Sequence, residues 1–583
     1  MAARAVESSP PVEWQQLVGY GLSELADTSL RRMKRWVPQI SVFRATGLAL
    51  SLPALGRGRP DAASDIYRGR FVFSGQAHEA AGKSIFAQKT ADPAWLESLH
   101  GFSWLQDLQA GGRELSRIQA RAFISDWLAE RRVHPRLASR VGVAGRRIIS
   151  GLRHAPYLLE GCASDFEILF FAGLTAETRL LSRRLATEPN DDARLTGTIG
   201  LAQAALGLAG LEGLRAGALA RLAGELEQQI LPDGGHRSRN PEKLLDLLID
   251  LEPIRMALHD ARLEIPADLN AAIERMLPML RFFVHGDGGL AGFNGMRDPA
   301  AGRVKAVLET DAVQGRPLLH APHSGYCRLA HGHATVIADV GRPPAPGLNE
   351  GAGAGLLSFE FSDGPSRIVV NCGTPAGDGE WRRAASLTAA HSTVCLGDQD
   401  ACSILDNPLS QKVFGTPVLL GPRELFARAE TTPEGSLVEA RHDGFVPRFG
   451  ILVERRLWLS ASGRDLRGED RFLADLERAG DVSPTTYALR FHLHPGVKAT
   501  LSKDRASVFL MLPDRTGWRF SVRGGRLKLE DSVYLTGQTT PRRTQQIVIR
   551  GTVGAPDRLY WAFKRIEKRQ ASKAGEDEPE LLL

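Results

Sequence analysis

The spacing of apolar residues changes once along this chain, near residue 300, and that change limits the folds open to it. Before residue 300, Leu and Ala recur every three or four residues, as in 166–185, 199–211, 214–230 and 244–258. Such spacing is typical of amphipathic helices. Asn240-Pro241 places a capping residue before a proline at the first helical position, which marks a helix start. We therefore predict paired helices with short connections, stacked in a ring or a solenoid.

Beyond residue 320 the apolar period shortens to two. The segments that show it lie between Gly, Asp, Asn and Pro residues and include 335–338, 357–361, 367–370, 451–459, 487–493, 506–512 and 545–549. Because no long helical segment separates them, we expect antiparallel sheets packed as a sandwich. The sequence thus predicts a multidomain chain with a helical half over residues 1–305 and a β-sandwich over 306–570. Residues 571–583 alternate in charge without periodicity, so we expect a disordered tail.

Composition excludes several classes of protein. With 43% hydrophobic and 24% charged residues in 583, the chain is neither disordered, collagenous nor a multi-span membrane protein. Its net charge of +6 suits an acidic ligand but is too diffuse to indicate nucleic acid. Five cysteines at no regular spacing indicate reduced thiols rather than a disulfide framework.

The N-terminal region bears on localisation. The first residues lack an apolar signal segment, and the apolar stretch 46–55 is too short to span a bilayer. We interpret that stretch as the end of a helix and a loop, and we expect no membrane span. The expected compartment is the cytoplasm, with the periplasm or cell envelope as the alternative.

Three segments carry residues suited to chemistry. Residues 233–241 place His236, Arg237 and Arg239 in a glycine-containing turn beside a helix start, where unpaired N–H groups and guanidinium groups favour an acidic ligand. The alternative is a capping loop with solvated charges. Residues 324–328 read as a strand-start turn with a packed Tyr326. The third segment is glycine-rich and runs over 349–355, followed by 370–373, 381–383 and 388–393; alone, these are ordinary sandwich turns.

Taken in order, these segments carry a family resemblance. SGYCRL, LLSFEFSDG, IVVNCGT and WRRAASLTAAHSTV resemble the C-terminal domain of the heparinase II/III family. Upstream, HGFSWL, QILPDGGH and DGGLAGFN resemble its helical half, and the resemblance covers about residues 60–555. It implies an N-terminal α/α toroid, an incomplete helical barrel, followed by a C-terminal antiparallel β-sandwich. Family members cleave uronic-acid polysaccharides by β-elimination, so the implied partner is an acidic polysaccharide or oligosaccharide. Neither nucleic acid nor a cofactor is expected, and a homodimer is left open.

The chemistry of β-elimination defines what such a site must hold. The proton on C5 is weakly acidic, so the neighbouring carboxylate must be neutralised while a base removes the proton and an acid protonates the leaving oxygen. On the resemblance, the candidate catalytic residues are His236, Tyr326, His391 and, if burial raises its pKa, Glu350. The candidate substrate-binding residues are Arg239, Asn240, Asn349 and Arg382.

The sequence also departs from the family pattern. Aligned on residues 357–360, the H-x-H-x-D cluster of the family falls at Gly351, Gly353 and Gly355. The aspartate that helps to hold zinc in the family falls at Asn371, which leaves His391 alone, so we predict no bound metal. The catalytic tyrosine of the family falls near 242–243 and is absent.

Two functions remain open from the sequence. The first is a polysaccharide lyase with a rearranged site, favoured by retention of the DGGH, SGY and AHS segments. The second is a non-catalytic protein that binds acidic carbohydrate on the same scaffold, favoured by loss of the histidine cluster. The sequence leans towards the lyase, and identifies neither the polysaccharide nor the base and acid.

Overall fold

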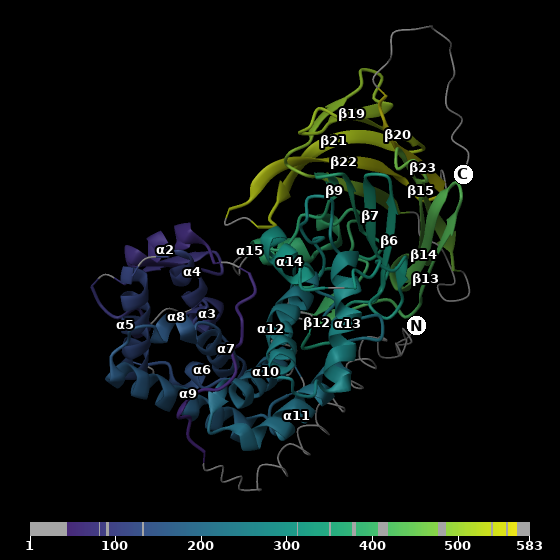
Figure 1. The fold of residues 1–583 in the computed structure, drawn as a ribbon. Coiled ribbons are helices and arrows are strands. Elements are labelled where there is room, and N and C mark those ends of the chain that lie inside the picture. The colour runs from purple at the N-terminus through teal and green to yellow at the C-terminus, as the bar shows by residue number, and fades with distance from the viewer. Residues whose placement is uncertain are drawn as a thin grey trace, which may run out of the picture.

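A computed structural model describes residues 43–567, except 57, 81, 89–91, 113, 131–132, 190, 312, 349–350, 376–379, 406–417, 476–484, 538–539 and 555–557. The described chain forms a ring of helices followed by a two-layer β-sandwich (Figure 1). This confirms the predicted order of a helical half and an antiparallel β half. The expected tail over 571–583 lies outside the described residues.

The ring is built from α2 (Pro60–Tyr67), α3 (Pro93–His100), α4 (Leu105–Ala110), α5 (Glu114–Glu130), α6 (Pro135–Ala138), α7 (Val141–Arg153), α8 (Ala155–Leu159), α9 (Ser164–Arg184), α10 (Asp192–Gly207), α11 (Arg215–Gln229), α12 (Pro241–Asp260), α13 (Ala267–Phe282) and α14 (Ala301–Leu308). The expected boundary after residue 305 falls within α14. Helices α7, α10 and α12 are buried along most of their length, whereas α5, α9, α11 and α13 keep an exposed face.

Glycine allows α7 and α10 to pack unusually closely. A side chain at Gly145 would lie 2.6 Å from the carbonyl oxygen of Thr196, and one at Gly200 would lie 2.8 Å from the Cα of Gly145. The small residues of α10 therefore serve to let the two helices pack closely. Among the described helices, none is long and apolar enough to cross a membrane.

The helical half also contains short strands that the helical period did not predict. β2 (Arg70–Phe73) and β3 (Gln76–Glu79) form a hairpin, joined by Ser74 and Gly75 with φ of 48° and 74°. Positive φ at both turn positions gives the twist that a two-residue hairpin needs. Residues 46–55, expected as a helix end and loop, instead begin with β1 (Gly47–Leu48) paired to β4 (Leu208–Ala209).

Two antiparallel sheets form the sandwich. The toroid-facing sheet follows the order β21 (Arg526–Tyr534), β22 (Arg542–Thr552), β17 (Thr486–Leu493), β9 (Ser366–Val370), β8 (Phe359–Asp363), β7 (Ala334–Asp339), β6 (Tyr326–His331) and β5 (His320–Ala321), with β10 (Val394–Leu396) also paired to β17. The outer sheet follows β13 (Leu425–Thr432), β14 (Gly435–Phe445), β15 (Ile451–Ser460), β16 (Asp465–Ala474), β23 (Arg558–Arg565), β20 (Gly517–Arg523), β19 (Ser507–Met511) and β18 (Lys498–Leu501).

Shorter elements complete the β half. They are β11 (Ser403–Leu405), β12 (Val418–Leu420), α15 (Glu380–Ser386) and α17 (Val446–Phe449). Aromatic side chains fill the space between the sheets, where Phe359 stacks on Trp561 with ring centroids 5.6 Å apart. Apolar residues at alternate positions of both sheets therefore supply the second core, as the period of two predicts.

Polar and charged side chains connect the two halves. Arg367 of β9 donates to both carboxylate oxygens of Asp287 at 2.8 and 3.1 Å. His285, which follows α13, lies 2.8 Å from the Ser362 hydroxyl and 3.1 Å from the Glu360 carboxylate. Arg367, His285 and Glu360 are buried, whereas Asp287 is partly open to solvent, so the His285–Glu360 hydrogen bond is the better screened of these contacts.

Buried histidines make the stability of this fold depend on pH. Burial lowers the pKa of His100, His154, His442 and His492 to about 3, and that of His236 and His494 to about 4. In the unfolded chain these groups protonate near their ordinary pKa of about 6.5. Below that pH the unfolded chain binds more protons than the folded one, which favours unfolding.

We predict that the free energy of unfolding falls as the pH is lowered from about 6.5 to about 4, by up to about 1.4 kcal/mol per pH unit for each such histidine. Urea unfolding at a series of pH values measures this slope. His442→Gln should reduce the slope by about one proton, because it removes one group that protonates only on unfolding. A stability independent of pH across this range would contradict the prediction.

Candidate functional site

The DGGH and SGY segments lie in direct contact rather than across an open cleft. The Asp233 carboxylate accepts from the backbone N–H of Ser324 at 2.7 Å and from its hydroxyl at 2.6 Å. A side chain at Gly235 would lie 3.0 Å from the Cβ of Ser324. The glycine and the aspartate therefore let the start of the sandwich rest against the turn between α11 and α12.

Arg239 is the most heavily bonded residue at this contact. Its guanidinium donates to the carbonyl oxygens of Ser324 and Arg342 at 2.7 Å each, to that of Gly325 at 3.0 Å, and to the Asp339 carboxylate. These bonds occupy four of the five N–H groups that an arginine carries. The side chain is buried, and Arg239 therefore holds the two halves of the chain together from within.

Tyr326 completes the same contact. Its ring lies 4.6 Å from the guanidinium carbon of Arg239, and its hydroxyl donates to the Arg239 carbonyl oxygen at 2.7 Å. The same hydroxyl accepts from the Asn294 amide at 2.6 Å. Burial raises the pKa of Tyr326 well above its ordinary value, so the hydroxyl is a poor proton donor to a leaving group.

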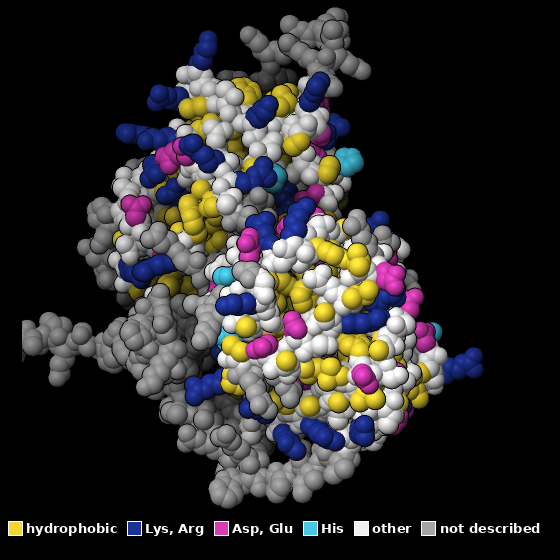
Figure 2. All heavy atoms as spheres, turned by 90° about the vertical axis from the view of Figure 1, so that its left-hand side faces the viewer, with side chains coloured by type: hydrophobic (Ala, Val, Ile, Leu, Met, Phe, Trp, Pro, Cys, Tyr) yellow, Lys and Arg dark blue, Asp and Glu magenta, His cyan; other side chains and the backbone are white. Residues whose placement is uncertain are grey.

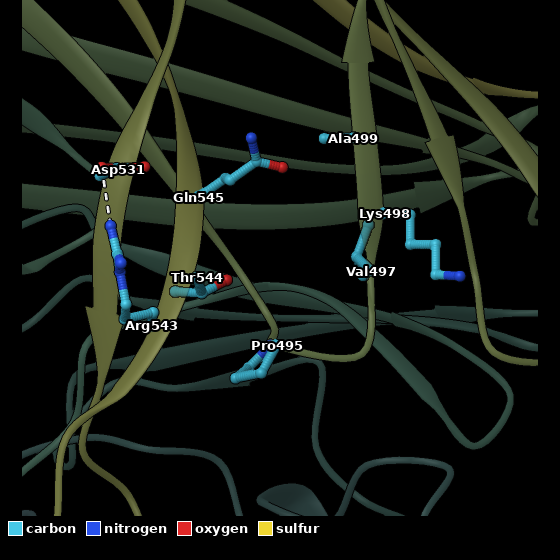
Figure 3. A pocket seen from close by; sticks show the side chains of 8 residues that line it. All are labelled: Pro495, Val497, Lys498, Ala499, Asp531, Arg543, Thr544 and Gln545. Atoms are coloured by element: carbon cyan, nitrogen blue, oxygen red, sulfur yellow. Dashed lines mark hydrogen bonds and ion pairs between the residues drawn. The ribbon is translucent and has the colours of Figure 1, made fainter.

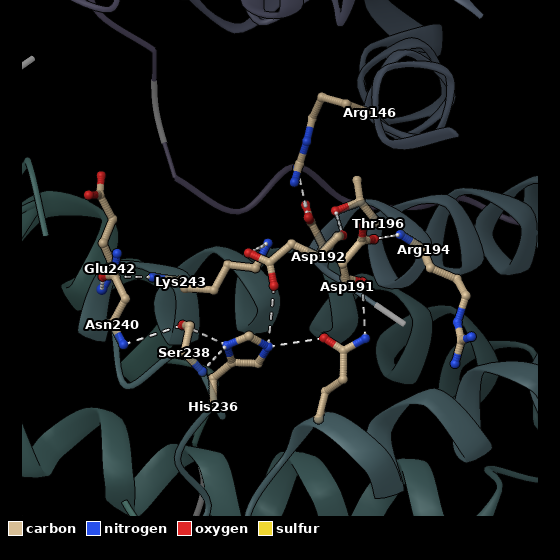
Figure 4. A network of polar contacts seen from close by, with 12 residues as sticks. Arg146, Asp191, Asp192, Arg194, Thr196, His236, Ser238, Asn240, Glu242 and Lys243 are labelled. Carbon is tan, nitrogen blue, oxygen red and sulfur yellow. Dashed lines mark hydrogen bonds and ion pairs between the residues drawn. The ribbon is translucent and has the colours of Figure 1, made fainter. Parts of the chain in front are cut away.

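His236 lies in a polar network at the N-terminal ends of α10 and α12 (Figure 4). Its Nδ1 is 2.8 Å from the Ser238 hydroxyl and its Nε2 is 3.2 Å from the Gln229 side-chain oxygen. Asp192 lies 3.6 Å from Nε2 and accepts from Lys243 at 3.0 Å. Burial lowers the pKa of His236 to about 4, so the imidazole is neutral, and both ring nitrogens already have protein partners.

Asn240 serves as the N-cap of α12. Its side-chain oxygen accepts from the backbone N–H groups of Glu242 at 2.8 Å and Lys243 at 3.4 Å. The capping interpretation of this loop, which the sequence left open beside the binding one, accounts for these bonds. Lys243 occupies the region where the family tyrosine was expected, and its ammonium pairs with Asp192.

Glu242 is a titratable group that the sequence did not single out as a candidate. Burial, and secondarily the nearby Asp246 carboxylate, raise its pKa to about 7. Its carboxylate accepts from the backbone N–H of Arg297 at 2.9 Å and lies 3.9 Å from the Arg303 guanidinium. Its position at the start of a helix and the second acid, Asp246, one turn later were visible in the sequence, but its burial was not.

His391 packs directly on the glycine-rich segment. A side chain at Gly353 would lie 2.6 Å from the His391 Nε2, and one at Gly355 would lie 2.8 Å from its Cγ. The His391 Nδ1 is 2.9 Å from the Leu387 carbonyl oxygen, to which it donates. The ring therefore fills the space that side chains at residues 353 and 355 would need.

The third glycine of this segment is constrained by its backbone. Gly351 has φ of 79°, in the region that glycine adopts far more readily than other residues. A side chain there would also lie 3.1 Å from the Cα of Gly295. A histidine at this position would therefore be strained in its backbone and crowded by the loop that follows α13.

Asn371, at the position of the family's metal-binding aspartate, hydrogen-bonds within the chain. The Asn371 side-chain oxygen accepts from the Ser392 N–H at 3.0 Å, and its amide donates to the Gly292 carbonyl oxygen at 3.4 Å. Within the described residues, no group of three or more His, Cys, Asp or Glu side chains could hold a metal ion. The absence of bound zinc stays a prediction that elemental analysis of the protein can check.

Of the remaining candidates, only Arg382 is described, and its guanidinium would lie 4.0 Å from a side chain at Gly351. Asn349 and Glu350 lie outside the described residues, so both stay untested candidates. Arg382 lies in α15 on the β half. The structure thus brings Arg239, Asn240 and Tyr326 together as a structural contact, with His236 nearby in the α10–α12 network.

We predict that Arg239→Lys lowers the free energy of unfolding by at least about 3 kcal/mol, because a lysine leaves buried carbonyl groups without donors at about 1–3 kcal/mol each. Thermal melting measures the effect, with Arg237→Lys in the same loop as the matched control. An unchanged melting temperature together with weaker binding of an acidic oligosaccharide would instead show that Arg239 binds the ligand.

We predict that Gly353→Ala destabilises the protein by about 1–3 kcal/mol, because the added methyl group overlaps the His391 ring. In a His391→Ala background the same change should cost at least about 1 kcal/mol less, since the overlapping ring is gone. Denaturant unfolding of the four proteins in this double-mutant cycle gives the coupling energy. Additive effects would show that His391 does not occupy this space.

Sequence comparison places these features in a family. The model of the heparinase II/III-like C-terminal domain matches residues 313–571. FtsZ-localized protein C of Caulobacter vibrioides is 33% identical to this chain over 498 residues, which cover 82% of this chain and 83% of that protein.

Structure comparison agrees on the fold. A crystal structure of heparinase III matches with a TM-score of 0.69 at 13% identity, over 95% of this chain and 91% of that one. A mutant of the heparan sulfate lyase HepC from Pedobacter heparinus matches with a TM-score of 0.58 at 14% identity, over 97% and 92% of the two chains. At these identities the solved structures establish the shared α/α toroid and β-sandwich. Together with the extended identity to the Caulobacter protein, they show that this chain belongs to the heparinase II/III-like family.

Proposed function

We propose that this chain is a non-catalytic protein that binds acidic polysaccharide on a polysaccharide-lyase scaffold. The observation that carries the proposal is the packing of His391 against Gly353 and Gly355. In the lyase pattern those positions carry the side chains of a histidine and acid cluster. Here the His391 imidazole fills the space of those side chains, so this chain lacks the cluster and has no room for it.

The surviving acid and base candidates support the same proposal. β-Elimination needs a base and an acid that both reach the sugar. His236 is buried with both ring nitrogens bonded, and the Tyr326 hydroxyl is bonded to Arg239 and Asn294. Arg239, the candidate for neutralising a uronate carboxylate, already forms an ion pair with Asp339.

One observation favours the competing function, a lyase with a rearranged site. Glu242 has a pKa of about 7, and a carboxylate tuned to neutrality is suited to act as a general base. It also stands beside Lys243, in the region where the catalytic tyrosine of the family was expected. A lyase of this kind would depend on Glu242, which makes the two functions separable by one substitution.

The cellular setting is a proposal by similarity. The Caulobacter relative is named for its localisation with FtsZ. The identity extends over most of both chains, which supports the same location for this chain. A binding protein on a disused enzyme scaffold suits such a role, since positioning requires affinity and no turnover.

The test uses the whole chain with polygalacturonate, alginate and hyaluronan as separate probes. We expect saturable binding by calorimetry and no increase in the ultraviolet absorbance of an unsaturated uronate product, because the described candidates His236 and Tyr326 are both engaged by protein partners. Dextran, which is uncharged, is the ligand control. Product formation that Glu242→Gln abolishes would overturn the proposal in favour of the lyase, and the absence of binding to every acidic probe would overturn both.

A further inference from the structure

Four cationic side chains lie close together on one face of the toroid-facing sheet, and we name them the cationic strip: Arg490 of β17, Arg550 of β22, and Arg526 and Lys528 of β21. Arg526 lies directly opposite Arg550. Lys528 lies opposite Val548, which in turn lies opposite Arg490. Because side chains alternate between the two faces of a strand, all four project from the same face.

This arrangement is unfavourable for an isolated sheet. Like charges directly opposite each other on neighbouring strands destabilise the pair. Glu530 neutralises part of the strip, with its carboxylate 3.2 Å from Arg550. Within the part of the chain that the structure describes, neither Arg526 nor Lys528 forms an ion pair, and both are exposed. The strip therefore keeps a positive charge that an anionic ligand would compensate.

The opposite face of the same hairpin shows a different pattern. There Arg543 pairs with Asp531 at 3.5 Å, beside a shallow surface pocket lined also by Lys498 and Gln545 (Figure 3). Figure 2 shows that Lys and Arg side chains outnumber Asp and Glu on the upper part of the molecule, where the sandwich lies. The strip therefore belongs to a generally basic part of the molecule, and it differs from the other face of the hairpin in that Arg526 lies directly opposite another cation, Arg550.

The strip leads away from the corner that holds His391. His492 lies opposite Gln546 on β22, one row from Arg490. The His492 Nε2 is 3.0 Å from the carbonyl oxygen of Ala389, two residues before His391. From this corner the rows of the sheet continue across β17 and β22 to β21 at the sheet edge. A ligand on the strip would therefore lie across the strands rather than inside the closed corner.

Two polar atoms on this face indicate the chemistry of the ligand. The Arg490 Nε and the Gln546 Oε1 are buried and have no hydrogen-bond partner among the described residues. The first needs an acceptor and the second needs a donor. A sugar hydroxyl can supply both, whereas a phosphodiester supplies acceptors alone. Carboxylates beside hydroxyl groups, as in a chain of uronic acids, match the cations and these two atoms together.

We propose that the cationic strip binds a linear acidic polysaccharide, with uronate carboxylates on Arg526 and Lys528 and sugar hydroxyls near Arg490 and Gln546. The inference rests on the proposed function, for which it names the binding surface. The strip replaces the Arg239 corner as the place where the ligand carboxylates are held. Arg526 and Lys528 lie at the edge strand, so a long polymer can extend past the protein.

The test compares two double charge reversals in the full chain. Arg526→Glu with Lys528→Glu removes the exposed part of the strip. Arg519→Glu with Arg523→Glu makes the same change in net charge on β20 of the outer sheet, where both residues are exposed. With oligogalacturonate as the probe, we expect the first variant to weaken binding at least about tenfold and the second to change it less than about threefold. Equal melting temperatures confirm that both variants are folded.

The outcomes separate this inference from the proposed function. If the parent protein binds oligogalacturonate and both variants bind it equally well, the strip is wrong while a glycan-binding function stands. If the parent protein binds none of the acidic glycans, the proposed function itself fails. If duplex DNA binds more tightly than oligogalacturonate and loses affinity in the strip variant, the strip is a nucleic-acid surface and the glycan assignment is overturned.

Discussion

The buried guanidinium of Arg239 is the interaction on which the arrangement of this molecule depends. Arg239 lies in the turn before α12, and its guanidinium donates to backbone carbonyl groups just before β6 and just after β7, the first long hairpin of the sandwich. A planar group with fixed donors can satisfy several carbonyls at once, which a lysine cannot. Asp339 balances the charge, so a buried ion is both paired and hydrogen-bonded. The relative position of ring and sandwich follows from that geometry.

The same contact explains how family segments can be retained without their catalytic use. The Asp233 carboxylate accepts from the backbone N–H and the hydroxyl of Ser324, and the glycines after Asp233 leave room for Ser324 to approach. Such residues would be kept for packing whether or not a sugar is ever cleaved. The replacement of the family side chains by glycine at 353 and 355 is different, because there the His391 ring fills the space that those side chains would need.

The corner around Arg239 and His391 differs in its electrostatics from the sheet face that carries the cationic strip. In the corner, burial keeps His236 and His391 in their neutral forms and pairs Arg239 internally. Along β17, β22 and β21, cations stand opposite one another with few acids between them. A diffuse net charge of +6 is thus distributed unevenly, and the unpaired part lies on a sheet face that a polymer can cross.

The sequence by itself determined the architecture. The change of apolar period from about 3.6 to two decides which residues can share a buried face, and that is local information. The resemblance carried by segments such as LLSFEFSDG then implied the toroid and sandwich, and the loss of the histidine cluster at Gly351, Gly353 and Gly355 was readable directly. The hairpin β2–β3 was missed because its turn is set by two positive φ angles within a helical context.

Only the tertiary structure decided what the polar residues do. The loop that holds Arg239 fits a binding site as well as a cap, and the role of Arg239 depends on partners 85 and 103 residues away along the chain, Ser324 and Arg342. The pKa of Glu242 near 7 and the opposition of Arg526 to Arg550 are likewise invisible in one dimension. Burial and strand register arise from contacts between distant segments, and those contacts set the free energy of a charge.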